Sequence, residues 1–249
     1  MAVLEHDVVA RPLPHLPSRL RALRIPGRAV LRWAMILAAA GLVFGTAGLD
    51  QHRLAPPPLE GSALTVLEGL AVRGAGTTPG GYSPAAFGTG WADVDGDGCD
   101  TRDEVLARDL RDVVRADGAC TVVGGLLQDP YTNHEVELDP GTLHAAVQVD
   151  HVVSLEDAWR SGAARWDQAR RERLAADPLN LLAASSAAVA VKDARDASGW
   201  LPASTGYRCQ YAARQVAVKR AYGLSVTPAE HEALAAVLNS CPAEPLPHR

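Results

Sequence analysis

Residues 147–153 read VQVDHVV, and residues 180–183 read NLLA. The first segment is rich in β-branched residues, which predicts a strand containing Asp150 and His151 near its end. The second segment predicts another short strand, and the Ala-rich stretch 186–197 predicts a helix after it. Two strands and a following helix, with helical segments between the strands, predict a ββα arrangement within a mixed α+β fold.

A histidine at the end of such a strand can face a groove that holds a phosphodiester. Neutral imidazole, here His151, can take a proton from water near neutral pH. The carboxylate of Asp150 can hold Mg²⁺, which stabilises a departing 3′ oxygen. Asn180, at the start of the second strand, can hydrogen-bond across the loop and fix the histidine. An Asp-His pair at a strand end is more often a surface turn, so the spacing alone does not establish a nuclease.

Signals elsewhere predict further helices and one β-hairpin. Residues 227–230 form a capping box with proline at the first helical position, which predicts a helix to about Asn239. Gly223 is typical of a helix end. The other predictions are a helix with one apolar face over 105–114, hairpin strands over 121–127 and 135–138 around the turn 129–133, and helices over 155–162, 166–176 and 208–222.

The composition excludes some classes of protein. The chain has 249 residues, a net charge of −5 and 47% hydrophobic residues. These values exclude overall disorder and a generally basic, histone-like nucleic-acid binder, and they suffice for one or two domains. The charge is uneven, because residues 1–53 hold seven Arg and three acidic residues, whereas residues 54–249 hold 17 basic and 26 acidic residues.

The N-terminal region predicts export. The segment 33–49 carries no charge and follows Arg28 and Arg32, which is typical of a signal peptide or a signal anchor. A small-residue cleavage site at 45–47 favours the first alternative, and the long basic leader leaves the second open. We expect a secreted domain, or a domain anchored in the membrane and facing away from the cytoplasm. The expected divisions are a leader over 1–53, a Pro-rich linker over 54–63, a domain over 64–242 and a tail over 243–249.

The cysteines form an even set, which predicts two disulfides in an oxidising compartment. Three pairings are open, and we favour the local one, Cys99 with Cys120 and Cys209 with Cys241. Zinc binding is the alternative, but no two of these cysteines have the CxxC spacing.

Six blocks carry a family resemblance: GCDTRDEVLARDL (98–110), LLQDPYT (126–132), VQVDHVVSLEDAW (147–159), DPLNLLA (177–183), WLP (200–202) and YRCQYAARQVAVKRAYGL (207–224). Together they resemble the exported HNH endonuclease family of actinobacteria, which is related to the C-terminal domain of GmrSD-type restriction endonucleases. The resemblance covers about residues 64–242.

The resemblance implies a ββα-metal (His-Me finger) core that hydrolyses DNA or RNA with one divalent ion, Mg²⁺ or Mn²⁺. By position, Asp150 matches the metal ligand, His151 the general base and Asn180 the residue that orients the loop. Lys192 matches a lysine on the finger helix. We expect a monomer. We also expect little preference for nucleotide sequence, because contacts to phosphate carry little sequence information.

One position departs from the family pattern. The second metal-binding residue usually follows the middle Asn by nine residues, and Val189 stands there. Valine cannot coordinate Mg²⁺. Asp193 lies four residues later and could reach back toward the same place, or it could simply be solvated. The alternative function is therefore a catalytically impaired HNH fold that serves as a binding or interaction module at the cell surface.

A second candidate metal site is independent of the first. Asp93, Asp95, Asp97 and Glu104 have the spacing of an EF-hand loop, which predicts an EF-like calcium loop. An acidic turn stapled by Cys99 is the other interpretation. A calcium-dependent surface domain is a third function.

Nucleic-acid contact requires positive charge. The segment 160–173 holds five Arg, and the segment 208–220 holds four basic residues and no acidic one. Arginine suits phosphate because its planar fork donates two hydrogen bonds at once. The candidate contacts are Arg102, Arg160, Arg165 and Lys192, and a solvated helix face is the alternative for each Arg.

Overall fold

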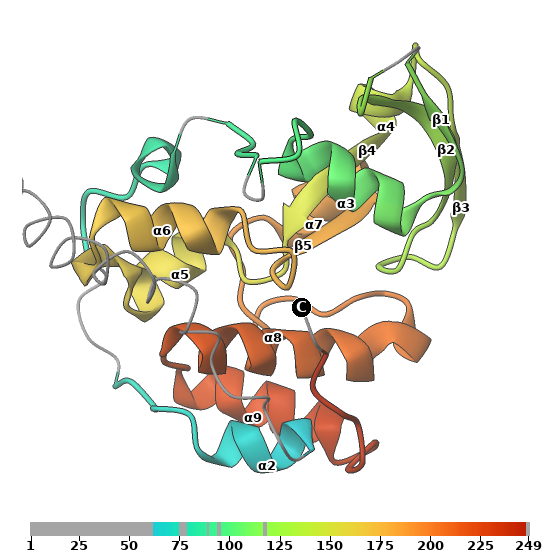
Figure 1. Cartoon of the computed structure of the whole chain (residues 1–249). Helices are drawn as coiled ribbons and strands as arrows, with labels where there is room; N and C mark the ends of the chain where they lie inside the picture. Colours follow the sequence, from blue (N-terminus) through green and yellow to red (C-terminus); the bar gives the residue numbers. More distant parts are fainter. Residues whose placement is uncertain (1–61, 75–78, 89, 94–95, 117–118, 248–249) are drawn as a thin grey trace, which may run out of the picture. The chain divides into compact units, whose positions relative to one another are not determined.

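The computed structural model describes residues 62–74, 79–88, 90–93, 96–116 and 119–247, all within one compact unit. It is a mixed α+β structure, as expected from the sequence (Figure 1). The expected leader over 1–53 and most of the linker lie outside the described residues. Within the described part of the chain, no helix has the length and apolar character needed to cross a membrane.

The central element is an antiparallel pair of strands, β4 (Val147–His151) and β5 (Leu181–Ser185). His151 lies opposite Leu181, and the helix α7 (Ser186–Lys192) follows β5 directly. The connection between the strands holds the helices α5 (Leu155–Ser161), η2 (Ala163–Arg165) and α6 (Gln168–Ala175).

The alternation of side chains along β5 divides the interior into two clusters. Leu181 and Ala183 pack with residues of α3 (Thr101–Asp109), which lies across β4 and β5 (Figure 1). Leu182 and Ala184 point to the other face and pack with aromatic residues. Successive residues of a strand point to opposite faces, so both faces of this strand pair are buried.

A separate three-stranded antiparallel sheet has the order β1-β2-β3. The predicted hairpin is confirmed, because Gln128 of β2 lies opposite Glu135 of β3. Asn133 in its turn has φ 61°, a conformation that asparagine tolerates better than most residues. The strands are β1 (Arg111–Arg115), β2 (Val122–Gln128) and β3 (Glu135–Leu138).

A helical layer supplies the largest apolar core. The helices α8 (Arg208–Tyr222), α9 (Pro228–Leu238) and α2 (Ala63–Glu68) pack on one another (Figure 1). The capping box at the start of α9 and the left-handed Gly223 after α8 are as the sequence predicts. The remaining short helices are η1 (Pro84–Phe87), α4 (Leu143–Ala146) and η3 (Thr205–Tyr207).

Both expected disulfides are present, Cys99–Cys120 and Cys209–Cys241. Two predicted helices are too long. The helix predicted over 105–114 ends at Asp109, because the following residues pair with β2 as strand β1. The helix predicted over 186–197 ends at Lys192, where Asp193 has φ 51° and breaks the helical conformation.

Candidate active site

The carboxylate of Asp150 lies at the centre of a buried polar cluster. The ammonium of Lys192, the last residue of α7, lies 2.9 Å from Oδ2 and 3.1 Å from Oδ1 of this carboxylate. The hydroxyl of Tyr131 donates to Oδ2 at 2.6 Å. Asp150 is 8% exposed, and neither partner has any exposed surface. Both oxygens of the carboxylate are therefore engaged by side chains of the protein itself.

The hydroxyl of Tyr131 remains a donor in this cluster. Burial raises the pKa of Tyr131 well above its usual value of 10, and the negative charge of Asp150 raises it further. The ring packs against Trp200, Tyr207 and Tyr211, with centroids 4.9, 6.3 and 5.9 Å away. The aromatic packing fixes the ring, and the ring fixes one oxygen of Asp150.

His151 is held by one hydrogen bond and one ring contact. Its Nε2 lies 2.8 Å from the carbonyl oxygen of Ala175. A carbonyl only accepts hydrogen bonds, so Nε2 carries the proton and Nδ1 is left as an acceptor. Trp91 stacks on the imidazole, with centroids 5.9 Å apart and planes 11° apart. Burial lowers the pKa of His151 by more than the hydrogen bond to Ala175 and the charge of Asp150 raise it. The ring is therefore neutral near pH 7.

Asn180 lies just before β5 and hydrogen-bonds to the residues that follow β4. Its Oδ1 accepts from Val153 N at 2.8 Å, and its Nδ2 donates to Val153 O at 3.1 Å. Its own carbonyl accepts from Val152 N at 2.7 Å. The side chain is fully buried. These three bonds fix the backbone that follows His151, and a role of Asn180 in orienting the histidine stays a prediction.

Two arginines hold the segment that carries Asn180, and the sequence did not single them out. Arg108 of α3 donates to the carbonyls of Pro178 and Leu181 at 3.1 and 2.7 Å. Arg214 of α8 donates to the carbonyls of Pro178, Leu179 and Leu181 at 2.9, 2.7 and 3.0 Å. The entry into β5 is therefore clamped between two helices that are distant in sequence.

The sequence also missed Tyr131 and Trp91 as residues of the site. Tyr131 falls within the block LLQDPYT, which indicates a hairpin turn and contributes to the family resemblance, but neither interpretation gives this tyrosine a role in the site. Trp91 precedes the acidic loop, and no local pattern connects it to His151.

Mg²⁺ is bound in many proteins by one or two carboxylates and completes its shell with water or phosphate, so the oxygens of Asp150 would have to be available to it. Val189 packs its methyl groups in the cluster of Tyr131 and Tyr211. Asp193 is exposed and lines a cavity with Glu156, Arg160 and Asp196. Among the described residues, no group of three His, Cys, Asp or Glu side chains with converging ligand atoms includes Asp150. Because both oxygens of Asp150 already bond to Lys192 and Tyr131, this carboxylate does not fit Mg²⁺ or Mn²⁺ as a ligand.

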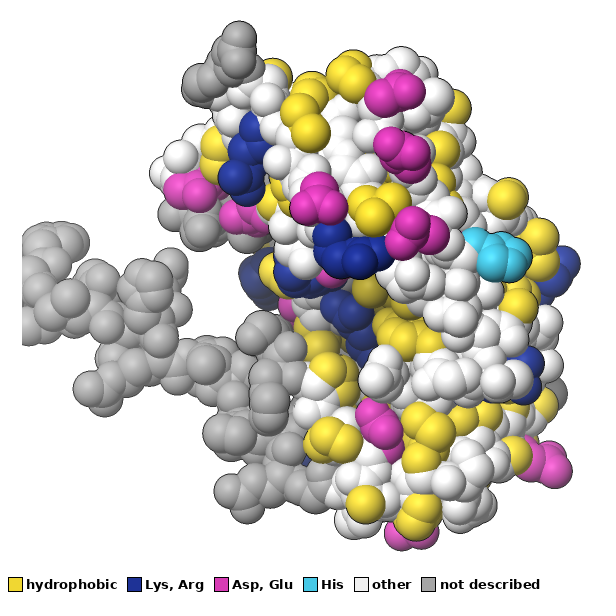
Figure 2. All heavy atoms as spheres, turned by 90° about the vertical axis from the view of Figure 1, so that its right-hand side faces the viewer, with side chains coloured by type: hydrophobic (Ala, Val, Ile, Leu, Met, Phe, Trp, Pro, Cys, Tyr) yellow, Lys and Arg dark blue, Asp and Glu magenta, His cyan; other side chains and the backbone are white. Residues whose placement is uncertain are grey.

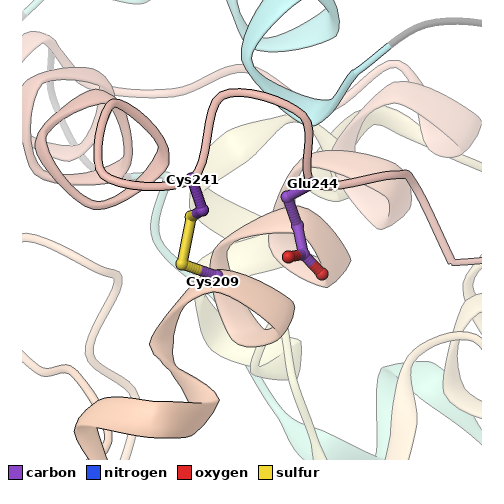
Figure 3. Close-up of side chains that lie close together, drawn as sticks. All are labelled: Cys209, Cys241 and Glu244. Atoms are coloured by element: carbon purple, nitrogen blue, oxygen red, sulfur yellow. A yellow bond between two sulfur atoms is a disulfide. The ribbon is translucent and has the colours of Figure 1, made fainter.

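Two other groups of converging ligand atoms have different explanations. Cys209, Cys241 and Glu244 lie together, and Figure 3 shows the carboxylate of Glu244 beside the disulfide. Its sulfur atoms are bonded to each other and are not free thiolates. In the second group, Asp157 and Glu230 are ion-paired with Lys219. Neither group has the character of a metal site.

The four expected nucleic-acid contacts differ in exposure. Arg165 is exposed, whereas Lys192 is fully buried. Arg102 lies 3.8 Å from Asp103, and Arg160 is paired with Glu156 and bonded to the carbonyl of Ala194.

The neighbouring Arg170 and Arg171 also serve the fold, since they donate to the carbonyls of Tyr222 and Ala86. Figure 2 shows Lys and Arg side chains gathered near the middle of one face, with Asp and Glu side chains next to them. Nucleic-acid binding by the arginines of 160–173 remains a prediction.

The acidic loop is organised around its first carboxylate. Asp93 accepts from Gly96 N at 2.7 Å and Gly98 N at 3.0 Å, and Asp97 accepts from Cys99 N at 2.8 Å. Asp97 and Glu104 line the same cavity, whereas Asp95 lies outside the described residues. Calcium binding here stays a prediction, and a melting temperature unmoved by chelator would contradict it.

Three comparisons place the chain among known proteins. Residues 100–237 match the family model described as "GmrSD restriction endonucleases, C-terminal domain". A protein of Arthroderma benhamiae, described as an uncharacterized secreted protein, is 38% identical over 192 residues, which cover 75% of this chain and 89% of that protein. No solved structure matches.

Proposed function

Because the chain belongs to the family of the C-terminal domain of GmrSD restriction endonucleases, we propose that it is an exported endonuclease of the HNH type. It hydrolyses phosphodiester bonds of DNA or RNA. The observation that carries this proposal is the state of His151: a neutral imidazole whose Nε2 is fixed on Ala175 and whose Nδ1 is left to accept a proton.

In the proposed reaction, Nδ1 of His151 takes a proton from a water molecule. The oxygen of that water bonds to phosphorus, the bond from phosphorus to the 3′ oxygen breaks, and the 3′ oxygen leaves with the electron pair. Trp91 and Ala175, which both contact His151, also line a recess of about 270 Å³ together with Glu172. Asn180 keeps the backbone after the histidine in position.

Plasmid nicking and RNA cleavage by the full chain test this proposal, each run with Mg²⁺, with Mn²⁺ and with chelator. His151→Ala should lower the rate at least about 100-fold, because a positioned general base contributes that much or more. The matched control is His134→Ala, which removes an exposed histidine in the β2–β3 turn. Equal rates for the wild type and His151→Ala would sink the enzyme hypothesis.

The second candidate is a binding or interaction module built on the same fold. Val189 favours it, because the methyl groups of this residue stand where the family pattern has a metal ligand. A gel shift with DNA and RNA distinguishes the two candidates. The module should bind with equal affinity as wild type and as His151→Ala, and neither protein should cut.

Export is the part of the proposal that concerns localisation. The secreted relative and two disulfides support an oxidising environment outside the cytoplasm. N-terminal sequencing of the protein recovered from its native host distinguishes a cleaved signal peptide from an uncleaved anchor. A mature protein found in the cytoplasm would contradict export.

A further inference from the structure

The environment of Asp150 points to a cation that is already present in the chain. The ammonium of Lys192 lies within 3.1 Å of both carboxylate oxygens and donates to the carbonyl of His151 at 2.8 Å. Tyr131 occupies a further acceptor direction of Oδ2. A metal ion that took Asp150 as a ligand would have to displace these partners.

Lys192 is fully buried, and its partners lie within the same cluster. It is the last residue of α7, and its side chain has no exposed surface. Its hydrogen bonds go to Asp150 and to the carbonyl of His151. A buried ion that loses its partner is strongly destabilised, so the ammonium is fixed by the same carboxylate that it neutralises.

The same helix also lacks the second ligand. Val189 lies three residues before Lys192, a spacing that places both on one face of α7. Val189 packs against the apolar cluster that contains Tyr131, whose hydroxyl is bonded to Asp150. At these two positions α7 therefore carries an apolar side chain and an ammonium, and neither can coordinate a metal ion.

We infer that the ammonium of Lys192 is the resident cation of this site and that Asp150 binds no divalent ion in this chain. Lys192 is thus a positioning residue, which holds the carboxylate of Asp150 and the carbonyl of the histidine next to it. The inference uses the proposed function to locate the site, but it is tested by metal binding, which is measured without nuclease activity.

The test counts Mn²⁺ ions bound by the full chain, by electron paramagnetic resonance, for the wild type and for Asp150→Asn. The two proteins should bind the same number of ions, including any held by the acidic loop. One ion more on the wild type than on Asp150→Asn would overturn the inference. A wild-type protein that does not nick DNA would contradict the proposed function but would not change the number of bound Mn²⁺ ions. Failure of the proposed function and failure of this inference are therefore distinguishable.

A second measurement needs no variant at Asp150. Mn²⁺ broadens the resonances of nearby nuclei, and Val189 packs against the cluster whose Tyr131 is bonded to Asp150. These resonances should be equally sharp in the wild type and in Asp93→Asn when Mn²⁺ is added. Methyl signals that Mn²⁺ erases in both proteins would overturn the inference.

Discussion

Two lysines of this protein have no exposed surface, and their charges are balanced differently. Lys192 faces one carboxylate, that of Asp150, in the β4–β5–α7 region. Lys219 of α8 faces two, with its ammonium 2.7 Å from Asp157 of α5 and 2.8 Å from Glu230 of α9. The first pair lies beside the candidate general base, and the second joins three helices of the largest core.

The pKa values of Asp157 and Glu230, the two carboxylates that Lys219 faces, are shifted in opposite directions. Burial raises the pKa of Glu230 from its ordinary value of 4.5 to about 7; Lys219 lowers it in part, and the charges of Asp157 and Asp196 raise it. Burial alone would raise the pKa of Asp157, but Lys219 and Arg73 hold it below its usual range. Lys219 and Arg73 together keep Asp157 ionised, whereas the pKa of Glu230 leaves that carboxyl group close to protonation near pH 7.

The largest effect is expected for Lys219→Met, which leaves two buried carboxylates without their cation. We expect the free energy of unfolding to fall by about 5 kcal/mol. Urea unfolding followed by circular dichroism measures it. The control is Arg220→Met, which changes the exposed neighbour on α8 and should stay within about 0.5 kcal/mol. Equal stability of the two variants would show that the cluster contributes nothing.

Lys192→Met should cost less, about 3 kcal/mol, because only one carboxylate loses its cation and Tyr131 still donates to it. The same urea experiment measures this value. Val191→Ala, at the exposed position next to it, serves as the control. A larger loss for Lys192→Met than for Lys219→Met would reverse the comparison of the two sites.

The raised pKa of Glu230 should make the stability of the protein depend on pH. A carboxyl group whose pKa is raised on folding binds more protons in the folded state, so its contribution falls as pH rises from 4.5 to about 7. Each unit of such a shift corresponds to about 1.4 kcal/mol.

Glu230→Gln keeps the uncharged shape and should remove this contribution. Urea unfolding at several pH values should therefore show the wild type losing stability relative to Glu230→Gln across this interval, with no further change above it. A difference between the two proteins that does not vary with pH would refute the assignment.

The smallest effect is expected at the helix caps that present the carboxylates. Thr227→Ala removes the capping box of α9 that holds Glu230, and Ser154→Ala removes the cap that bonds to Asp157 N at the start of α5. Each should cost about 1 kcal/mol in the free energy of unfolding. Thr227→Ala should also change the dependence of stability on pH that we attribute to Glu230. If stability depended on pH in the same way in Thr227→Ala and Ser154→Ala, the capping box would not influence the titration of Glu230.

Local signals allowed much of this fold to be predicted. The helix α8 ends at Gly223 and α9 begins at Thr227 because a left-handed glycine and a capping box act within a few residues. Strand β1 was missed because its conformation depends on pairing with β2, and helical periodicity alone extended α3 through it. Non-local pairing overrides a local apolar pattern.

The site was predictable to a similar degree. Asp150, His151 and Asn180 lie at the predicted places around β4 and β5 because strand ends can be located from sequence. The partners of Asp150 could not be found in this way, because Tyr131 and Lys192 are 19 and 42 residues away. Arg108 and Arg214 likewise serve carbonyls in a distant segment, and nothing in a basic residue's own neighbourhood says that it will bind backbone instead of phosphate.

The central claim is that His151 activates a water molecule for attack on phosphorus. The most direct measurement is mass spectrometry of an oligonucleotide cleaved in oxygen-18-labelled water. The account predicts one labelled oxygen on the 5′ phosphate of the product and no such product with His151→Ala. A product whose phosphate carries no label, as attack by a sugar hydroxyl would give, or an equal labelled yield from His151→Ala, would contradict it.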